Sequence, residues 1–386
     1  MKILPQSTIY KKHQSFDGIR HQRFLPNILE RIRALQGNVL SLNLNDYRKD
    51  VIGRACRDIL SDSEVTDNHP AFSLHSNVVE EISRISDKDL PRYIFYRYRY
   101  EMYPQLFELD EFPPCLQIEP TSACNYRCVF CYQIDKEFTK KSNGHIGIMS
   151  LETFKRLIDQ AEGHCEAVTL ASRGEPFLNP YIKEMLRYVS GKFLALKMNT
   201  NASLLDEEKC HAILESGVKT LVFSADAASE PTYGQLRVRG RLERVLERIK
   251  MFSDIRARHY PSSPIITRVS GVKVDATPNI EEMEKFWGEL VDQVAFVNYN
   301  PWESTYERPI NQITAPCSEL WLRMFVWWDG TVNPCENDYR SSLAVGNCSK
   351  LNLSQLWRSE PYEFLREQHL SKKRSACSPC RQCPVV

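Results

Sequence analysis

Three cysteines lie within eight residues, at Cys124, Cys128 and Cys131, with the spacing C-x3-C-x2-C. On a tight loop, three thiolates at this spacing can hold three irons of a four-iron cluster. The fourth iron then has no protein ligand, and a small molecule can chelate it. A structural zinc site is the alternative, but it usually has four protein ligands, and the nearest histidine is His145. The spacing therefore favours an iron–sulfur cluster with one open iron.

Six short apolar runs alternate with longer amphipathic stretches between about residues 114 and 300. Strands that alternate with helices of this length form right-handed βαβ units and a parallel sheet. Six such units predict an α/β fold with a partial (β/α)6 TIM-like barrel, in which chemistry takes place at the C-terminal ends of the strands. The predicted strands are 115–119, 167–172, 194–199, 220–225, 265–274 and 294–299, and the predicted helices are 150–162, 181–189, 206–215, 241–256 and 280–290.

The cysteine loop directly follows the first predicted strand, where a barrel places its active site. Cys124, Cys128 and Cys131 resemble the defining motif of the radical S-adenosylmethionine (radical SAM) superfamily, and the resemblance extends from about residue 116 to the C-terminus. It implies that the amine and carboxylate of S-adenosylmethionine (AdoMet) chelate the open iron. It also implies that one electron from the cluster cleaves the sulfonium and releases a 5′-deoxyadenosyl radical, which abstracts a hydrogen atom from the substrate.

Residues after the second and third predicted strands resemble two further elements of the family. The segment RGEP at 173–176 is similar to the family's GGEP loop, with an arginine in place of the first glycine. This similarity implies that the backbone at Gly174 and the side chain of Glu175 meet the methionyl ammonium. Asn199 and Asn201 are similar to the segment that contacts the ribose, because their polar side chains can bond the sugar hydroxyls.

The end of the fourth predicted strand adds to the resemblance. Ser224 and Asp226 are similar to the family's Ser-x-Asp element, and Arg237 stands where an arginine can pair with the methionyl carboxylate. Each residue also has an ordinary interpretation, with Glu175 in a solvated turn, Asn201 as a helix cap and Arg237 on the surface. Their order at successive strand ends favours the AdoMet site.

A second group of cysteines near the C-terminus can form a four-cysteine site. Cys317 and Cys335 precede a late C-x2-C pair, and this arrangement resembles the short form of the SPASM domain, which carries an auxiliary four-iron cluster. The pair is assigned to Cys380 and Cys383, because a proline before Cys380 fits the family pattern. Cys377 could substitute or remain a free thiol. A zinc ribbon would use the same four thiolates.

The chain divides into three predicted parts, which are a mainly helical N-terminal extension (1–110), the radical SAM partial barrel (111–305) and a SPASM-like auxiliary-cluster domain (306–386). Within the extension, helices are expected near 27–35 and 77–85. The segment 92–103 is rich in tyrosine and arginine. It could form a surface on which nucleic-acid bases stack, but a helix that packs its aromatic side chains onto the barrel is the favoured interpretation.

The composition is typical of a cytoplasmic globular protein. Hydrophobic residues make up 42% of the chain and the formal charge is +1, with no block of like charges that would mark a nucleic-acid-binding tail. The N-terminus lacks the apolar core of a signal peptide, and no apolar run is long enough to span a membrane. In a reducing compartment the thirteen cysteines are not expected to form disulfides. Cys56, Cys115, Cys165 and Cys210 are expected to be small buried residues.

The substrate is less well defined by the sequence. Short-SPASM members of the family include enzymes that modify peptides and enzymes that oxidise sugars or aminocyclitols. Residues 1–110 lack the strand–hairpin–helix rhythm of a leader-binding domain, so we expect hydrogen abstraction from a carbohydrate-like metabolite, with flavodoxin or ferredoxin as electron donor. A fully liganded auxiliary cluster would accept an electron in an oxidation. A free thiol, Cys348 or Cys377, could return a hydrogen atom in an epimerisation; Cys348 is not expected to be a cluster ligand.

Other side chains could contact the substrate or transfer a proton. Lys273 on the fifth strand, and Trp302, Glu303 and Tyr306 after the sixth, are the candidates. Radical modification of a peptide or protein side chain is the alternative reaction. A non-catalytic zinc-binding module and a nucleic-acid-modifying enzyme fit part of the sequence, although the near-zero net charge argues against the latter.

Overall fold

A computed structural model describes residues 8–11, 25–61, 71–274, 280–299 and 301–385. The chain forms two compact units. One consists of Met1–Lys12 together with Glu111–Val386, and the other consists of His13–Asp110.

The smaller unit is helical over its described residues. It contains α2 (Leu25–Asn38), α3 (Asp46–Leu60), α4 (Ser76–Ser83) and α5 (Leu90–Leu106). In α5, the side chains of Tyr93, Phe95, Tyr96 and Tyr98 are buried, and the rings of Tyr93 and Tyr96 meet edge to face with centroids 5.8 Å apart. Buried rings cannot stack on nucleic-acid bases, so this segment is a helix with buried aromatic side chains and not a stacking surface.

The larger unit is built on one mixed sheet, whose described strands follow the order β1-β9-β8-β6-β5-β4-β2-β10-β11-β12. Neighbouring strands from β2 to β9 in this order are parallel. The parallel strands are β2 (Cys115–Ile118), β4 (Ala167–Leu170), β5 (Ala195–Thr200), β6 (Thr220–Ser224), β8 (Ile266–Lys273) and β9 (Gln293–Asn298). They coincide with the predicted strands to within a few residues, and the predicted α/β partial barrel is confirmed.

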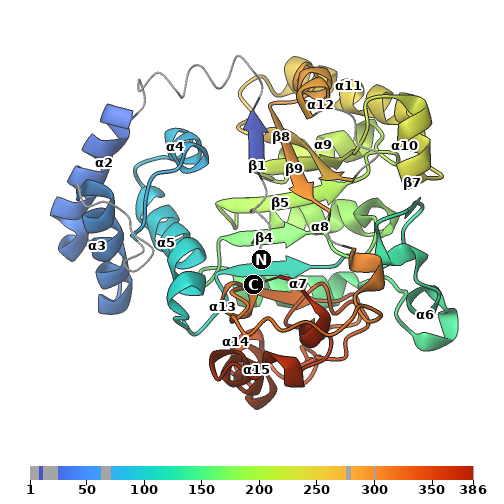
Figure 1. Cartoon of the computed structure of the whole chain (residues 1–386). Coiled ribbons are helices and arrows are strands. Elements are labelled where there is room, and N and C mark those ends of the chain that lie inside the picture. Colours follow the sequence, from blue (N-terminus) through green and yellow to red (C-terminus); the bar gives the residue numbers. More distant parts are fainter. Residues whose placement is uncertain (1–7, 12–24, 62–70, 275–279, 300, 386) are drawn as a thin grey trace. The chain divides into compact units, whose positions relative to one another are not determined.

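Helices alternate with these strands (Figure 1). They are α7 (Leu151–Ala161), α8 (Ile182–Val189), α9 (Glu207–Glu215), α11 (Leu242–His259) and α12 (Ile280–Gly288). Two of them begin at the expected caps, because the side chains of Ser150 and Asp206 accept hydrogen bonds from the first-turn backbone N–H groups. Among the described residues, no helix is long and apolar enough to cross a membrane.

The two faces of the sheet differ in polarity. On β5, Leu196 and Met198 are buried, whereas Lys197 and Asn199 on the opposite face keep some accessible surface. Alternate residues of a strand point to opposite faces, so the apolar set packs toward the helices and the polar set faces the barrel interior, which we call the lumen. The lumen face therefore carries the polar, partly accessible side chains that a reaction needs.

Segments outside the predicted barrel extend the sheet at both edges. β1 (Thr8–Lys11) pairs antiparallel with β9, and β10 (Arg323–Val326) pairs parallel with β2. β11 (Thr331–Asn333) and β12 (Gly346–Asn347) continue the sheet beyond β10. The C-terminal part also contains α13 (Glu319–Leu322), α14 (Leu353–Trp357) and α15 (Glu360–Leu370).

Candidate active site

The three cysteines of the first motif lie on one loop after β2, and their thiols affect one another. Burial, together with the negative charges of Glu175 and Cys128, raises the pKa of Cys124 to about 12. Burial also raises the pKa of Cys131, as do Cys128 and Cys124. The thiol of Cys128 is therefore close enough to Cys124 and Cys131 to act on both, which fits three sulfurs that face a common space. Iron binding would displace their protons and supply the compensating positive charge.

A short strand pair places an arginine beside this loop. β3 (Arg127–Cys128) pairs antiparallel with β7 (Arg237–Val238), and Nη1 of the arginine in β7 lies 3.8 Å from Sγ of the cysteine in β3. Nε of the same arginine lies 2.5 Å from Oδ2 of the fully buried Asp226. Arg237, which the sequence assigned to the methionyl carboxylate, is therefore anchored by Asp226 and directed at the cysteine loop.

The loop after β4 approaches the cysteine loop so closely that it requires a glycine. A Cβ atom added at Gly174 would lie 2.3 Å from the carbonyl oxygen of Thr121 and 2.4 Å from that of Ala123. The next residue, Glu175, donates its backbone N–H to the Ala123 carbonyl at 2.8 Å. The predicted methionyl-binding loop therefore lies directly against the base of the cysteine loop.

The last residue of β5 and the residue that follows it hold the carboxylate of Glu175. Thr200 Oγ1 donates to Glu175 Oε1 at 2.7 Å, and the backbone N–H of Asn201 donates to Oε2 at 2.7 Å. Burial nevertheless raises the pKa of Glu175 to about 6. Asn201 also donates its Nδ2 to Asn125 Oδ1 in the cysteine loop, at 2.9 Å. Thr200 and Asn125 were not expected from the sequence, although both stand beside residues that the motif had marked.

Asn199 Oδ1 and Ser172 Oγ, at this end of the barrel, are among the buried polar atoms that lack a hydrogen-bond partner in the described residues. Ser224, at the end of β6, is partly accessible on the lumen face. Buried polar groups are normally satisfied, so these atoms mark a place for a polar ligand. The donors and acceptors present fit a nucleoside and an amino acid, which are the two halves of AdoMet.

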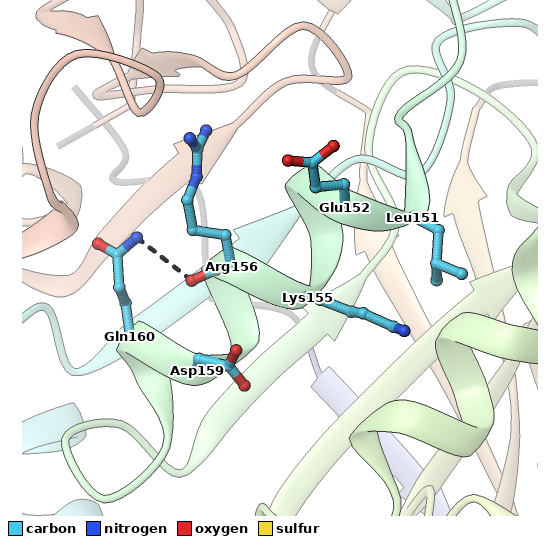
Figure 2. Close-up of a pocket in the computed structure, with 6 residues that line it drawn as sticks. All are labelled: Leu151, Glu152, Lys155, Arg156, Asp159 and Gln160. Atoms are coloured by element: carbon cyan, nitrogen blue, oxygen red, sulfur yellow. Dashed lines mark hydrogen bonds between the residues drawn. The ribbon is translucent and has the colours of Figure 1, made fainter.

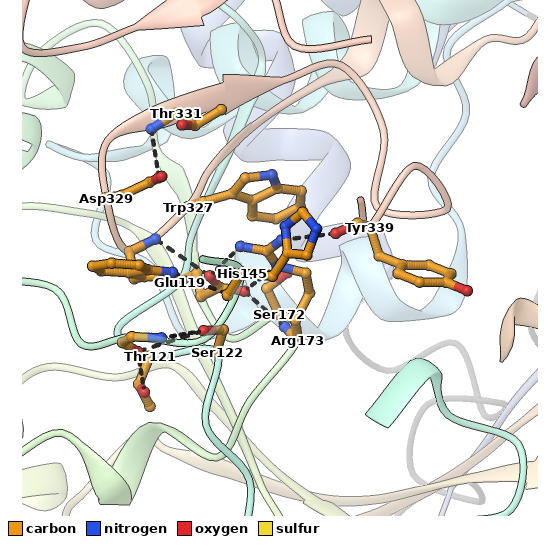
Figure 3. Close-up of polar contacts among 12 residues, drawn as sticks. Glu119, Thr121, Ser122, His145, Ser172, Arg173, Trp327, Asp329, Thr331 and Tyr339 are labelled. Carbon is orange, nitrogen blue, oxygen red and sulfur yellow. Dashed lines mark hydrogen bonds and ion pairs between the residues drawn. The ribbon is translucent and has the colours of Figure 1, made fainter. Parts of the chain in front are cut away.

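The arginine that replaces the first glycine of the GGEP pattern has a structural role (Figure 3). Arg173 Nε and Nη2 donate to the two carboxylate oxygens of Glu119, each at 2.7 Å, and both side chains are buried. Arg173 Nη1 donates to the Tyr339 carbonyl at 2.8 Å, and its guanidinium lies 4.1 Å from the Trp327 ring centroid. Arg173 thus joins the ends of β2 and β4 to the C-terminal segment. In the sequence, Glu119 ends the first predicted strand and Arg173 follows the second, and this position at strand ends was the available signal.

His145 does not complete a zinc site with the first cysteines. Its ring stacks on Phe138, with centroids 5.7 Å apart, and it lies close to Arg173 in Figure 3. Burial lowers the pKa of His145, as do Arg173 and Arg340. Among the residues with described coordinates, no group of three or more His, Cys, Asp or Glu side chains is arranged to hold a single metal ion.

The second cysteine group comes together from three separate segments. Burial raises the pKa of Cys335 well above its usual value, and Cys383, Cys317 and Cys380 raise it further. Cys377 affects Cys380 but is not among the groups that shift the pKa of Cys335 or Cys317. The four cysteines chosen from the sequence therefore converge, and Cys377 also lies near Cys380.

Buried polar side chains organise the segments that carry these four cysteines. Arg374 is buried and donates to the carbonyl oxygens of Ala315, Cys380 and Cys383, at 3.3, 3.2 and 2.7 Å. The backbone N–H of Asn337 donates to Cys335 Sγ at 3.3 Å, and its Nδ2 donates to Cys383 Sγ at 3.5 Å. Such N–H···S contacts suit the sulfur ligands of a cluster.

The remaining candidate residues lie in different surroundings. Cys348 Sγ faces Arg156 Nη2 at 3.8 Å, away from the other cysteines, and Lys273 is exposed at the end of β8. Glu303 accepts a hydrogen bond from the Tyr299 hydroxyl. Tyr306 donates its hydroxyl to Asp338 at 2.7 Å. Trp302 is half-buried.

A surface pocket lies on α7 rather than at the strand ends (Figure 2). Its lining consists of Leu151, Glu152, Lys155, Arg156, Asp159 and Gln160. Within it, Gln160 Nε2 donates to the Arg156 carbonyl at 3.2 Å. The pocket contains none of the predicted site residues, so we do not assign the reaction to it.

Two family models match this chain. The radical SAM superfamily model matches residues 118–267, and the SPASM iron–sulfur cluster-binding domain model matches residues 317–384. The chain belongs to the radical SAM superfamily and carries a C-terminal SPASM domain, as the sequence predicted. Its cofactors are accordingly AdoMet, the 4Fe–4S cluster that binds it, and an auxiliary 4Fe–4S cluster.

Individual relatives are distant. The tungsten-containing aldehyde ferredoxin oxidoreductase cofactor-modifying protein of Pyrococcus furiosus is 24% identical over 326 residues, which cover 70% of this chain and 89% of that protein. Streptococcus suis SuiB bound to its precursor peptide SuiA has a TM-score of 0.56 at 16% identity, over 94% of this chain and 82% of SuiB. BtrN in complex with AdoMet and 2-DOIA has a TM-score of 0.50 at 15% identity, over 72% of this chain and 95% of BtrN. These two structures are similar in fold alone.

Proposed function

We propose that this protein oxidises a polar, carbohydrate-like metabolite after AdoMet-dependent hydrogen abstraction. When bound, AdoMet and its cluster supply the 5′-deoxyadenosyl radical that removes a hydrogen atom, and the auxiliary cluster supplies an acceptor for the electron that the substrate then loses. Loss of a hydrogen atom, a proton and an electron converts an alcohol into a carbonyl. An electron donor such as flavodoxin or ferredoxin would supply the electron consumed in AdoMet cleavage.

The residues around the first motif would bind different parts of the cluster and of AdoMet. Cys124, Cys128 and Cys131 would hold three irons. Glu175 would receive the methionyl ammonium, whose positive charge would favour the ionised form of this buried carboxylate. Asn199, Asn201 and Ser224 would bond the ribose and adenine, and Gly174 would let the backbone approach. Arg237 would keep positive charge beside the cluster thiolates.

The convergence of Cys317, Cys335, Cys380 and Cys383 is the observation that carries oxidation rather than epimerisation. Four thiolates occupy all four irons of a cluster, which leaves it suited to electron transfer and not to substrate chelation. Cys348 and Cys377, the thiols that could return a hydrogen atom, do not contact the residues assigned to AdoMet. The Pyrococcus relative, named as a cofactor-modifying protein, supports a small-molecule substrate.

Anaerobic reconstitution tests this proposal. The wild-type chain should contain about eight irons and should form 5′-deoxyadenosine when it is reduced with AdoMet. The Cys380→Ala variant should lose about four irons and retain uncoupled AdoMet cleavage, whereas the matched Cys377→Ala variant should keep both clusters. A colourless protein that binds zinc and forms no 5′-deoxyadenosine would refute the proposal.

The outcome of the reaction can be tested separately in deuterium oxide with a panel of polyols. Oxidation forms a carbonyl product, and that product gains no carbon-bound deuterium from a thiol. Epimerisation would return one deuterium from an exchangeable S–H group to the product. If the product contains deuterium, and the deuterium is lost in Cys348→Ala or Cys377→Ala, the reaction is an epimerisation and not an oxidation.

A further inference from the structure

The lumen face of the sheet carries charged side chains as well as the residues assigned to AdoMet. Parallel pairing aligns Asn199 with Val222, Val222 with Arg268, and Arg268 with Gln293. Residues paired in this way point to the same face. Lys197 lies on that face two residues before Asn199, or about 7 Å earlier along the strand. The barrel therefore has a basic layer at and below the level of the AdoMet residues.

The arginines of this layer are held by neighbouring amide side chains. Arg268 Nε and Nη2 donate to Gln293 Oε1, at 2.9 and 2.5 Å. Arg323 Nη1, from β10, donates to Gln117 Oε1 at 3.2 Å, and Gln117 Nε2 donates to Glu336 at 3.3 Å. These contacts fix the positions of the guanidinium groups but leave the layer with more positive than negative charge.

Lys197 differs from the arginines because its amine makes no hydrogen bond or ion pair with any residue that the structure describes. Burial lowers the pKa of Lys197 to about 8; Arg323 and Arg268 lower it too, and Cys115 and Glu336 act in the opposite direction. The side chain still has accessible surface. A lysine that is desolvated and still keeps accessible surface can be reached by a small ligand.

An unpaired cation in such a place destabilises the protein, and an apolar side chain of similar length would fill the same volume without this cost. Charged groups in clefts that are maintained at a cost to stability are typical of functional sites. Since no residue that the structure describes is a partner of Lys197, a ligand from solution would fit this position. It must be negatively charged and small enough to enter the lumen.

We propose that Lys197 and Arg268 bind an anionic group of the substrate, a carboxylate or a phosphate, inside the barrel. This inference rests on the proposed function and names the class of metabolite more closely, as a carbohydrate-like acid or phosphate ester. Binding at the layer of Lys197 would hold the charged end of the molecule deeper than Asn199. The rest of the substrate would then extend toward the residues assigned to AdoMet.

The methionyl carboxylate of AdoMet is the other anion that could reach this layer. In that case Lys197 would serve AdoMet and not the substrate. The two possibilities can be distinguished by replacing Lys197. If Lys197 binds AdoMet, the replacement lowers the affinity for AdoMet. If Lys197 binds the substrate, the replacement lowers the affinity for an anionic sugar.

Isothermal titration calorimetry on the reconstituted, AdoMet-loaded full chain without reductant separates these possibilities. Three probes share a six-carbon polyol and differ in charge, namely glucose 6-phosphate, gluconate and glucose. We expect one of the anionic probes to bind and glucose not to bind, and the identity of that probe distinguishes phosphate from carboxylate. Lys197→Met should weaken its binding at least about 10-fold, which is about 1.4 kcal/mol. The exposed Lys250→Met serves as the matched control.

Several results would overturn the inference. They are the absence of binding by both anionic probes, binding of glucose with equal affinity, unchanged affinity in Lys197→Met, or an equal loss of AdoMet affinity in that variant. Lys197→Gln replaces Lys197→Met if the methionine variant does not fold. Formation of 5′-deoxyadenosine by the reduced wild-type enzyme is measured independently, so the anion site can fail while the proposed function stands.

Discussion

The two cysteine groups of this chain are assembled in different ways. The first occupies one continuous loop, and its surroundings are polar side chains at the ends of β4, β5 and β6. The second draws its cysteines from three segments, with Cys317 sixty-three positions before Cys380 in sequence, and depends on side chains that bind backbone carbonyls. A local loop can form its site as soon as one strand is placed. A site assembled from distant segments requires the tertiary structure first.

The largest expected effect comes from breaking the first group. Cys128→Ala should remove an iron ligand on the open-site cluster and lower 5′-deoxyadenosine formation by at least about a thousandfold, or about 4 kcal/mol in activation free energy. Product analysis after anaerobic reduction provides the measurement. Cys210→Ala, at a buried cysteine outside both groups, is the control and should keep most of the activity. Full activity in Cys128→Ala would contradict the assigned role.

The buried pair of Arg173 and Glu119 sharpens the comparison, because it joins the first site to the C-terminal segment. Arg173→Met leaves the carboxylate of Glu119 buried without its partner, and we expect a loss of about 3–5 kcal/mol in unfolding free energy. Urea denaturation under anaerobic conditions measures this loss. The exposed pair of Arg241 and Glu243, 3.1 Å apart, provides the control. Arg241→Met should cost less than about 1 kcal/mol, and an equal cost for both variants would contradict the structural role of Arg173.

The sequence predicts the features that depend on neighbouring residues better than the features that join distant segments. The six parallel strands, their helices and the caps at Ser150 and Asp206 were predicted, because local periodicity and capping chemistry determine them. Helix α3 was missed, although Asn45 caps it by accepting a hydrogen bond from the Arg48 N–H at 2.9 Å. The pairings of β1 with β9 and of β10 with β2 were also missed, since they join residues almost 300 and more than 200 positions apart.

Side-chain partnerships were the least predictable part of the site. Arg173 was recognised as a departure from a glycine pattern, but its partners lie on β2 and in the C-terminal segment, which no local pattern links to it. Lys197 stands two residues before Asn199 in the sequence, and nothing in its local pattern gives it a role. Its importance depends on Arg268 and Arg323, which come from other strands, and on the absence of a partner among the described residues. The sequence contains these residues but not their distances.

Arg374 holds the segments of the second cysteine group, as the strand-end residues hold the loop of the first. Its removal should therefore affect the second group alone. Arg374→Met eliminates three hydrogen bonds, to the carbonyls of Ala315, Cys380 and Cys383, so we expect the auxiliary site to lose about 2–4 kcal/mol of stabilisation. Iron content should fall from about eight toward about four per chain, while AdoMet cleavage persists. Lys373→Met, at the exposed neighbouring position, should retain both clusters. Equal loss of iron from both sites would mean that the two groups are not independent.

The smallest expected effect is a gain in stability, from Lys197→Met. The folded chain disfavours the charged form of this lysine, because its pKa falls from 10.5 to about 8. Between these values the unfolded chain binds more protons than the folded one, so wild-type stability rises with pH across this window. At pH 7 the cost is fully present, and its removal should raise the unfolding free energy by about 1–3 kcal/mol. This gain should fade as the pH rises from 8 toward 10.5.

Urea midpoints of the wild type and of Lys197→Met at pH 7 and pH 10 measure this difference, with Lys250→Met expected to match the wild type at both. A lysine with a structural role would give the opposite sign, since its removal would break contacts and lower the midpoint. Gain of stability together with loss of anion binding is the combination expected of a residue retained for function at the expense of stability. A lower midpoint at pH 7 would instead make Lys197 part of the scaffold, like Arg173 and Arg374.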